Sequence, residues 1–165
     1  MKDYVIKRTY GATDFDVVKD VYYQTWKTSY RGMIPQEYLD SLDKTITWHP
    51  EKLVGSTYIA VSQQNKIIGV CTYGQSRDER FPNMGEVYSI YVLPEWQSGG
   101  VGQSLLARSL HKLKAQYDQI YLAVLEKNEP AQKFYESFGF SQTEYTTTTE
   151  TSYGNLHEVI YMTKA

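Results

Sequence analysis

Residues 86–113 form the stretch that most constrains how this chain can fold. The β-forming residues of 87–92 predict a strand, and Pro94, which has no N–H to donate, ends its ladder. The glycine-rich segment 97–102 follows. A helix is predicted next, because apolar residues recur at helical spacing: Leu106, Leu110 and Leu113. A glycine-rich turn before a helix leaves backbone N–H groups unpaired, so this stretch predicts a site for an anionic phosphate group.

Two common phosphate-binding motifs do not fit the residues around these glycines. A P-loop ends in Gly-Lys-Ser/Thr, but Gly102 is followed by Gln103 and Ser104, so no lysine reaches a γ-phosphate. A dinucleotide fingerprint needs a third glycine where Leu105 stands, and no acidic residue closes a following strand in the expected place. The simpler alternative is a glycine-rich turn that only lets a helix pack on a sheet.

The segment resembles the pyrophosphate loop of the GNAT (Gcn5-related) N-acetyltransferases, which reads Gln/Arg-x-x-Gly-x-Gly/Ala after a strand that ends near a proline. Gln97, Gly100 and Gly102 match that loop position for position. A second stretch, 122–140, resembles the family's other hallmark: a strand, an asparagine, a short helix that carries a tyrosine, and then Gly-Phe. The two stretches occur in the family's order and at its usual separation, and the resemblance covers nearly the whole chain.

The resemblance implies a mixed α/β chain with the GNAT fold, in one domain spanning residues 1–165. Its central sheet would have six or seven mostly antiparallel, twisted strands that splay apart at the cofactor site, with about four flanking helices. The alternation of predicted strands and helices along the chain also favours a mixed sheet over a helical bundle.

The resemblance further implies that acetyl-CoA is the cofactor. Loop N–H groups would bind the pyrophosphate, and pantetheine would lie along the main chain of 90–92 like an extra strand and contact Asn128. An N–H in that strand would polarise the thioester carbonyl, in the manner of an oxyanion hole. The cofactor-binding residues are then expected to be Ile90, Tyr91, Val92, Gln97, Ser98, Gly99, Gly100, Val101, Gly102, Gln103, Asn128, Ala131, Phe134 and Tyr135.

Two residues stand where the family places its catalytic groups. Tyr135 would be the general acid, because a phenol with a pKa of about 10 can protonate a thiolate, whose thiol has a pKa of about 8.5, as its charge develops. Glu86 would be the general base that takes the amine's proton, often through water. Some relatives instead carry a glutamate on the following strand, where this chain has Ala123. The alternatives are a packed aromatic for Tyr135 and a solvated carboxylate for Glu86.

The resemblance also implies that the acceptor amine lies beside the connection between the first two helices, because in that family this loop flanks the acceptor site. The first helix is predicted to begin at an N-cap on Thr13 and to end near 29–32, and the second to span about 36–42. Aromatic faces and carboxylates attract an ammonium group, so a primary amine of a small molecule, amino acid or peptide fits this wall. The wall residues would be Trp26, Tyr30, Met33 and Ile34, with Glu37 and Asp40 close behind. The alternative is that Trp26 is a core residue and the carboxylates face water.

Composition narrows the class of protein. A net charge of −2 argues against a dedicated nucleic-acid binder. The single cysteine, Cys71, lies in an apolar strand and is expected to be a buried hydrophobe, and no metal site is expected because His49 has no second ligand at suitable spacing. No apolar run approaches membrane-spanning length, and residues 1–10 lack a signal peptide's hydrophobic region.

We therefore expect a bacterial, cytoplasmic N-acetyltransferase with no nucleic-acid or membrane partner, and a homodimer is compatible with the resemblance. An alternative from another class is a GNAT-fold module that binds or senses CoA with little turnover. The presence of both Tyr135 and Glu86 favours the enzyme. A nucleotide-binding fold is the more distant alternative.

Overall fold

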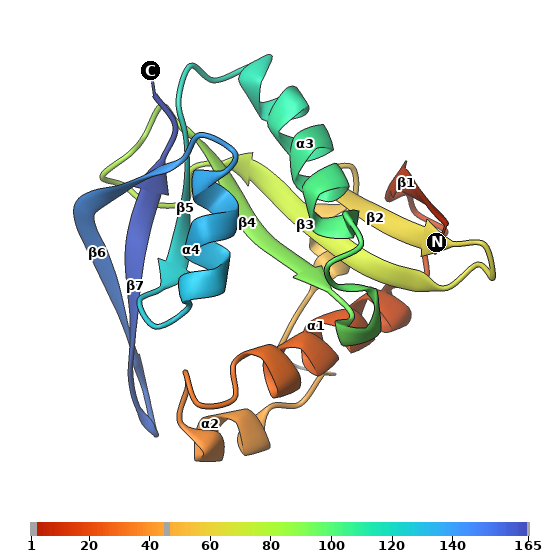
Figure 1. Ribbon diagram of the computed structural model, residues 1–165, viewed down its shortest axis with the longest axis horizontal. Coiled ribbons are helices and arrows are strands. Elements are labelled where there is room, and N and C mark those ends of the chain that lie inside the picture. Colours follow the sequence, from red (N-terminus) through yellow and green to blue (C-terminus); the bar gives the residue numbers. More distant parts are fainter. Residues whose placement is uncertain (1–2, 45–46, 165) are drawn as a thin grey trace.

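The structure is a computed structural model that describes residues 3–44 and 47–164; Met1, Lys2, Thr45, Ile46 and Ala165 lie outside the description. The signal-peptide expectation for residues 1–10 therefore falls in part outside it. Within the described residues, one sheet of seven strands has the order β1-β2-β3-β4-β5-β7-β6 (Figure 1). The strands are β1 Tyr4–Arg8, β2 Thr57–Ser62, β3 Ile67–Gln75, β4 Gly85–Val92, β5 Ile120–Leu125, β6 Ser141–Thr151 and β7 Gly154–Met162.

The same residues form four α-helices and two 3₁₀ turns. The α-helices are α1 Phe15–Ser29, α2 Gln36–Ser41, α3 Val101–Lys114 and α4 Glu129–Glu136, and the 3₁₀ turns are η1 Pro50–Leu53 and η2 Pro94–Trp96. The predicted mixed α/β fold is thus confirmed. No helix within the described ranges combines the length and the apolar character that a membrane crossing requires.

The sheet is antiparallel except between β4 and β5, which run parallel and then separate. Within the described chain these two strands pair at Gly85↔Ile120 and Glu86↔Tyr121 and no further, although β4 continues to Val92. β5 instead pairs along its length with β7. The expected splay of the sheet is therefore present, and it leaves the second half of β4 without a neighbour on one side.

A β-bulge in β4 lies just beyond the last β4–β5 pair. The β3–β4 register passes from Thr72↔Ser89 to Tyr73↔Val87, which leaves Tyr88 as an extra residue. A bulge bends its strand and increases the local twist. This irregularity is located where β4 turns away from β5.

Helices α1 and α3 cover opposite faces of the central strands. Gly69 of β3 faces α3 so closely that an added Cβ would lie 3.0 Å from Leu105 and 3.1 Å from Val101. Successive strand residues point to opposite faces. On the other face, the Tyr22 ring of α1 packs against the Tyr91 ring of β4 with centroids 5.0 Å apart. Helix α3 therefore holds the glycine loop against the sheet while α1 supports β4 from behind.

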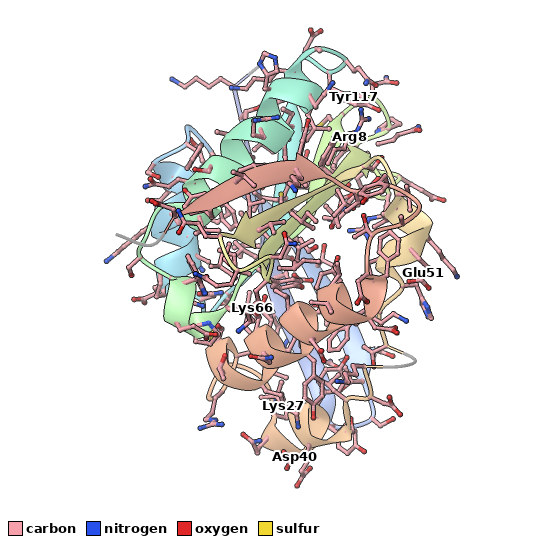
Figure 2. All side chains as sticks on the ribbon, turned by 90° about the vertical axis from the view of Figure 1, so that its right-hand side faces the viewer. Arg8, Lys27, Asp40, Glu51, Lys66 and Tyr117 are labelled. Atoms are coloured by element: carbon pink, nitrogen blue, oxygen red, sulfur yellow. The ribbon has the colours of Figure 1, made fainter. Side chains whose placement is uncertain are left out.

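Helix α1 is capped at its start, and its end lies beside α2. The N-cap of α1 is Asp14, whose side chain accepts a hydrogen bond from Val17 N at 3.3 Å. The prediction of Thr13 as N-cap is therefore wrong by one residue, because its hydroxyl instead accepts from Tyr10 N at 3.0 Å. Figure 1 shows α2 beside the end of α1, where Lys27 Nζ lies 3.9 Å from an oxygen of Asp40 (Figure 2).

Candidate active site

The main cavity has a volume of about 660 Å³ and opens where β4 and β5 separate. It brings together the two sequence stretches that resemble the family hallmarks, since residues of the glycine loop and of α4 face one another across it. The predicted cofactor residues that line it are Ile90, Tyr91, Val92, Gln97, Ser98, Gly100, Gly102, Gln103, Asn128, Ala131, Phe134 and Tyr135. Tyr30 and Met33, predicted for the acceptor wall, also line it.

The glycine loop presents the N-terminus of α3 to this cavity. Gly100 is the N-cap residue, with φ +85° and ψ 0°, a left-handed conformation that glycine adopts without a steric penalty. No side chain in the described ranges caps the helix, and the N–H groups of its first turn have no partner within the helix. Gln97 Nε2 donates to Val92 O at 3.0 Å and ties the loop to the end of β4. These residues fit a pyrophosphate group, since a helix N-terminus attracts anions.

Two loop residues predicted to bind the cofactor do not line the cavity. Val101 is 1% exposed, and its side chain packs in the core beneath α3. Gly99 also lies outside the lining residues. The side chain of Val101 thus anchors the helix to the sheet, and its backbone N–H, at the first helical position, is the part left to face a ligand.

Tyr135 reaches the cavity from α4. The helix starts at Asn128, whose Oδ1 accepts from Ala131 N at 3.3 Å. The Tyr135 ring packs against Phe134, with centroids 5.5 Å apart, and against Phe140 at 6.1 Å. Burial raises the pKa of this phenol well above its usual value, with smaller contributions from Cys71 and Tyr91, so Tyr135 keeps its proton at neutral pH.

Trp26 of α1 does not line either cavity described for this site. Its indole N–H donates to the Tyr91 hydroxyl at 3.0 Å, and its ring packs edge-on against Tyr30 with centroids 4.8 Å apart. Burial raises the pKa of Tyr91 to about 12, although hydrogen bonds with Trp26 and Tyr30 act in the opposite direction. Trp26 thus orients a cavity tyrosine from behind and does not itself face either cavity.

Glu86 also lies outside the residues that line the cavity. Its side chain is buried at 6% exposure, and one oxygen accepts from Tyr121 Oη at 2.7 Å and from Arg77 N at 2.9 Å. The other oxygen accepts from Arg77 Nη2 at 2.7 Å. These bonds hold the β3–β4 connection to the sheet. The geometry therefore gives Glu86 a structural role and does not support the base role expected from the sequence.

We expect Glu86→Ala to lower the free energy of unfolding by about 1–3 kcal/mol, because the Tyr121 hydroxyl and the Arg77 N–H lose an acceptor. The matched control is Glu95→Ala, which removes an exposed carboxylate 3.4 Å from Lys66 and should change that free energy by about 0.5 kcal/mol or less. Urea denaturation followed by circular dichroism measures both. Equal stability of the two variants would show that Glu86 does not anchor the loop.

The cavity also contains residues that the sequence reasoning missed. Glu158 of β7 is the most informative, because it is an acidic residue on a strand face shared with two buried apolar residues, Leu156 and Ile160. The position of a glutamate between two apolar residues on one strand face can be read from the sequence, so Glu158 could have been found there. The other missed lining residues are Thr25, Ser29, Ala123, Val124, Leu125 and Pro130.

A second cavity of about 470 Å³ adjoins the connection between α1 and α2 and the start of β7. Met33 and Leu125 line both cavities and therefore mark their junction. Ile34 lines the second cavity only and packs with Leu39 and Leu156. The carboxylates expected behind this wall do not line either cavity, and Asp40 accepts a hydrogen bond from Gln36 at 2.8 Å instead.

Comparison with known proteins agrees with this geometry. Residues 19–140 match the Acetyltransferase (GNAT) family. The chain is 31% identical over 132 residues to the uncharacterized N-acetyltransferase YuaI of Bacillus subtilis (strain 168), covering 76% of this chain and 73% of that protein. It is 24% identical over 136 residues to the L-amino acid N-acyltransferase MnaT of Escherichia coli (strain K12), covering 81% and 78%.

A solved structure shares the fold. The PaiA N-acetyltransferase from Thermoplasma acidophilum, in complex with coenzyme A, superposes with a TM-score of 0.73 at 22% identity, covering 99% of both chains. The family match over most of the chain carries more weight for function than this likeness. The chain therefore belongs to the GNAT family of acetyl-CoA-dependent N-acetyltransferases.

Proposed function

We propose that acetyl transfer to a primary amine takes place in the main cavity, with Tyr135 as the general acid. One observation carries this assignment: the Tyr135 phenol and the N-terminus of α3, neither of which has a side-chain partner among the described residues, face the same cavity, which the splay of β4 and β5 opens. The helix N-terminus suits the pyrophosphate of an acyl-CoA molecule, and the phenol suits its thioester end.

In this proposal the chain holds the acyl donor at three places. N–H groups at the start of α3 bind the pyrophosphate, the unpaired edge of β4 binds the pantetheine amides, and Asn128 lies beside them at the start of α4. Holding reactants in a reactive geometry contributes as much as about 7–11 kcal/mol in favourable cases. Binding and orientation are therefore the main tasks of these residues.

The bond changes balance with one acid and one base. The amine nitrogen attacks the thioester carbonyl carbon, the C–S bond breaks, and the departing sulfur takes the phenol proton of Tyr135 while the nitrogen loses a proton. Because burial raises the pKa of Tyr135, the acid stays protonated across the physiological range. Loss of activity on the alkaline side of neutrality should therefore not come from this residue.

We further propose that the acceptor enters through the second cavity and presents its amine at the junction formed by Met33 and Leu125. The lining there mixes apolar residues with polar ones, which suits a small amine, an amino acid or a peptide end. The similarity to a relative named as an L-amino acid N-acyltransferase supports an amino-acid-like acceptor. The net charge of −2 argues against a nucleic-acid-bound one.

We expect Met33→Ala to raise the acceptor KM by about 10-fold, because truncation removes apolar contact from the junction. The acetyl-CoA KM should change much less, since the substitution leaves the glycine loop and the start of α3 intact. Asp40→Ala is the control, because Asp40 is on the adjacent helix but lines neither cavity. Equal acceptor KM values for Met33→Ala and the parent would place the acceptor elsewhere.

A panel of amines, amino acids and short peptides assayed for thiol release from acetyl-CoA tests the proposal as a whole. The expected result is release that depends on one chemical class of amine. Tight CoA binding with no release for any amine would instead favour a CoA-binding or sensing module.

A further inference from the structure

The two glutamates nearest the splayed strands differ in what surrounds their carboxylates. The carboxylate of Glu86 accepts hydrogen bonds from Arg77 and Tyr121 and does not line the cavity. Glu158, by contrast, is one of the residues that line the cavity. In the part of the chain that the structure describes, no residue donates a hydrogen bond to the Glu158 side chain or forms an ion pair with it.

We propose that Glu158 is the general base that accepts the proton of the acceptor amine, and is therefore a catalytic residue of this enzyme. This role rests on the proposed function, because it requires an amine at the junction of the two cavities. Its position supports the role directly, since Glu158 pairs in register with Leu125, the β5 residue that lines both cavities.

The groups around Glu158 shift the pKa of its carboxyl upward. The groups that face it are Arg77 from the β3–β4 connection, Glu86 and Tyr91 from β4, and Tyr30 from α1. Its partners in the neighbouring strands, Leu125 and Thr147, are uncharged. Burial raises its pKa, and Glu86 adds to the rise, while Arg77 acts in the opposite direction. A base is most effective when its pKa lies close to the working pH.

Glu158 and Tyr135 reach the main cavity from different elements. Glu158 comes from β7 and Tyr135 from α4. Burial and Tyr91 make the largest contributions to the raised pKa of Tyr30, and Tyr135 and Glu158 are both close enough to raise it further. The proton on the amine nitrogen passes to an oxygen of Glu158 as the nitrogen–carbon bond forms. The sulfur then leaves with the Tyr135 proton, so one residue gains a proton while the other loses one, and solvent restores both.

The test is a pH profile of kcat/KM for Glu158→Gln with the best amine from the panel. We expect a loss of about 100-fold or more near pH 7, because general-base catalysis contributes about 10²–10⁴-fold. The low-pH limb set by carboxylate ionisation should disappear, and activity should recover partly at high pH, where the free amine predominates. Glu158→Asp should retain part of the activity with the limb intact. The exposed Glu144→Gln on β6 is the control and should match the parent.

Two readouts besides turnover separate this role from a structural one. Acetyl-CoA affinity, measured by calorimetry, should stay within about twofold in Glu158→Gln, because the loop is intact. The second readout is ¹³C NMR of the glutamate carboxyl groups. The resonance that is present in the parent and absent from Glu158→Gln belongs to Glu158, and in the parent it should titrate above the ordinary glutamate pKa of about 4.3.

The stability of the variant provides a check on folding. A folded-state pKa raised above the unfolded one means that stability falls as pH rises through the window between the two values. Replacing Glu158 by glutamine removes that loss, so at pH 8 Glu158→Gln should melt no lower than the parent. Low activity in a variant that melts normally then reports on catalysis.

Three results would overturn the assignment. The first is a low-pH limb that persists in Glu158→Gln but disappears in Glu86→Gln, which would make Glu86 the base. The second is a higher acceptor KM with unchanged kcat, which would make Glu158 an ammonium-binding group only. The third is a titration of the Glu158 carboxyl at or below the ordinary pKa. A parent protein that releases no thiol with any amine would instead overturn the proposed function, and the base role with it.

Discussion

Tyr135→Phe is expected to lower kcat by about 100-fold or more while the affinity for acetyl-CoA stays nearly constant. The substitution removes one hydroxyl and keeps the ring that packs against Phe134 and Phe140. General-acid catalysis typically contributes about 10²–10⁴-fold, and here the leaving sulfur would depart without its proton donor. Because kcat and kcat/KM should fall together, the lost interaction belongs to the transition state.

Single-turnover measurements are the right assay for this variant, since they isolate chemistry from product release. Tyr153→Phe is a suitable control, because Tyr153 is 42% exposed in the turn between β6 and β7 and lines neither cavity. The control should react at the parent rate. A parent-like rate for Tyr135→Phe would reduce Tyr135 to a packing residue and remove the acid from the proposed mechanism.

Gly100→Ala is expected to weaken acetyl-CoA binding by about 10-fold or more. The left-handed conformation at Gly100 costs an L-residue about 1–2 kcal/mol, and relief of that strain would shift the N–H groups at the start of α3. The substitution also adds a methyl group to the loop. In the protein alone it meets only the Tyr4 hydroxyl at 3.7 Å, an ordinary contact, so the fold should tolerate it.

Gly55→Ala provides a control matched in backbone strain. Gly55 has φ +82°, open space around the position of a new Cβ, and no place in either cavity. Calorimetry should show a weaker Kd for acetyl-CoA in Gly100→Ala and an unchanged one in Gly55→Ala, with similar losses in melting temperature. An unchanged Kd in both variants would contradict the assignment of the glycine loop to the pyrophosphate.

The sequence alone determined the parts of this protein that depend on local interactions. The strand, glycine turn and helix of 86–113 follow from β propensity, the missing N–H of Pro94 and the spacing of the leucines, all within one short segment. Gly100 was expected to permit a turn, and it does so with a positive φ. The α4 cap at Asn128 is equally local, because the side chain bonds to an N–H three residues away.

Tertiary structure alone decided which acidic residue is free to act. The carboxylate of Glu86 is already hydrogen-bonded, because Arg77 folds back from the β3–β4 connection and Tyr121 lies opposite in β5. Neither contact follows from the residues that are next to Glu86 in the sequence. Glu158 faces the cavity because β7 pairs with β5 in a register that puts it beside Leu125. Such pairings join residues far apart in the chain, and a shift of one residue would turn every side chain of a strand to the other face. The sequence could therefore predict the glycine turn and the helix that carries Tyr135, whereas the orientation of the carboxylates depended on how the strands pair.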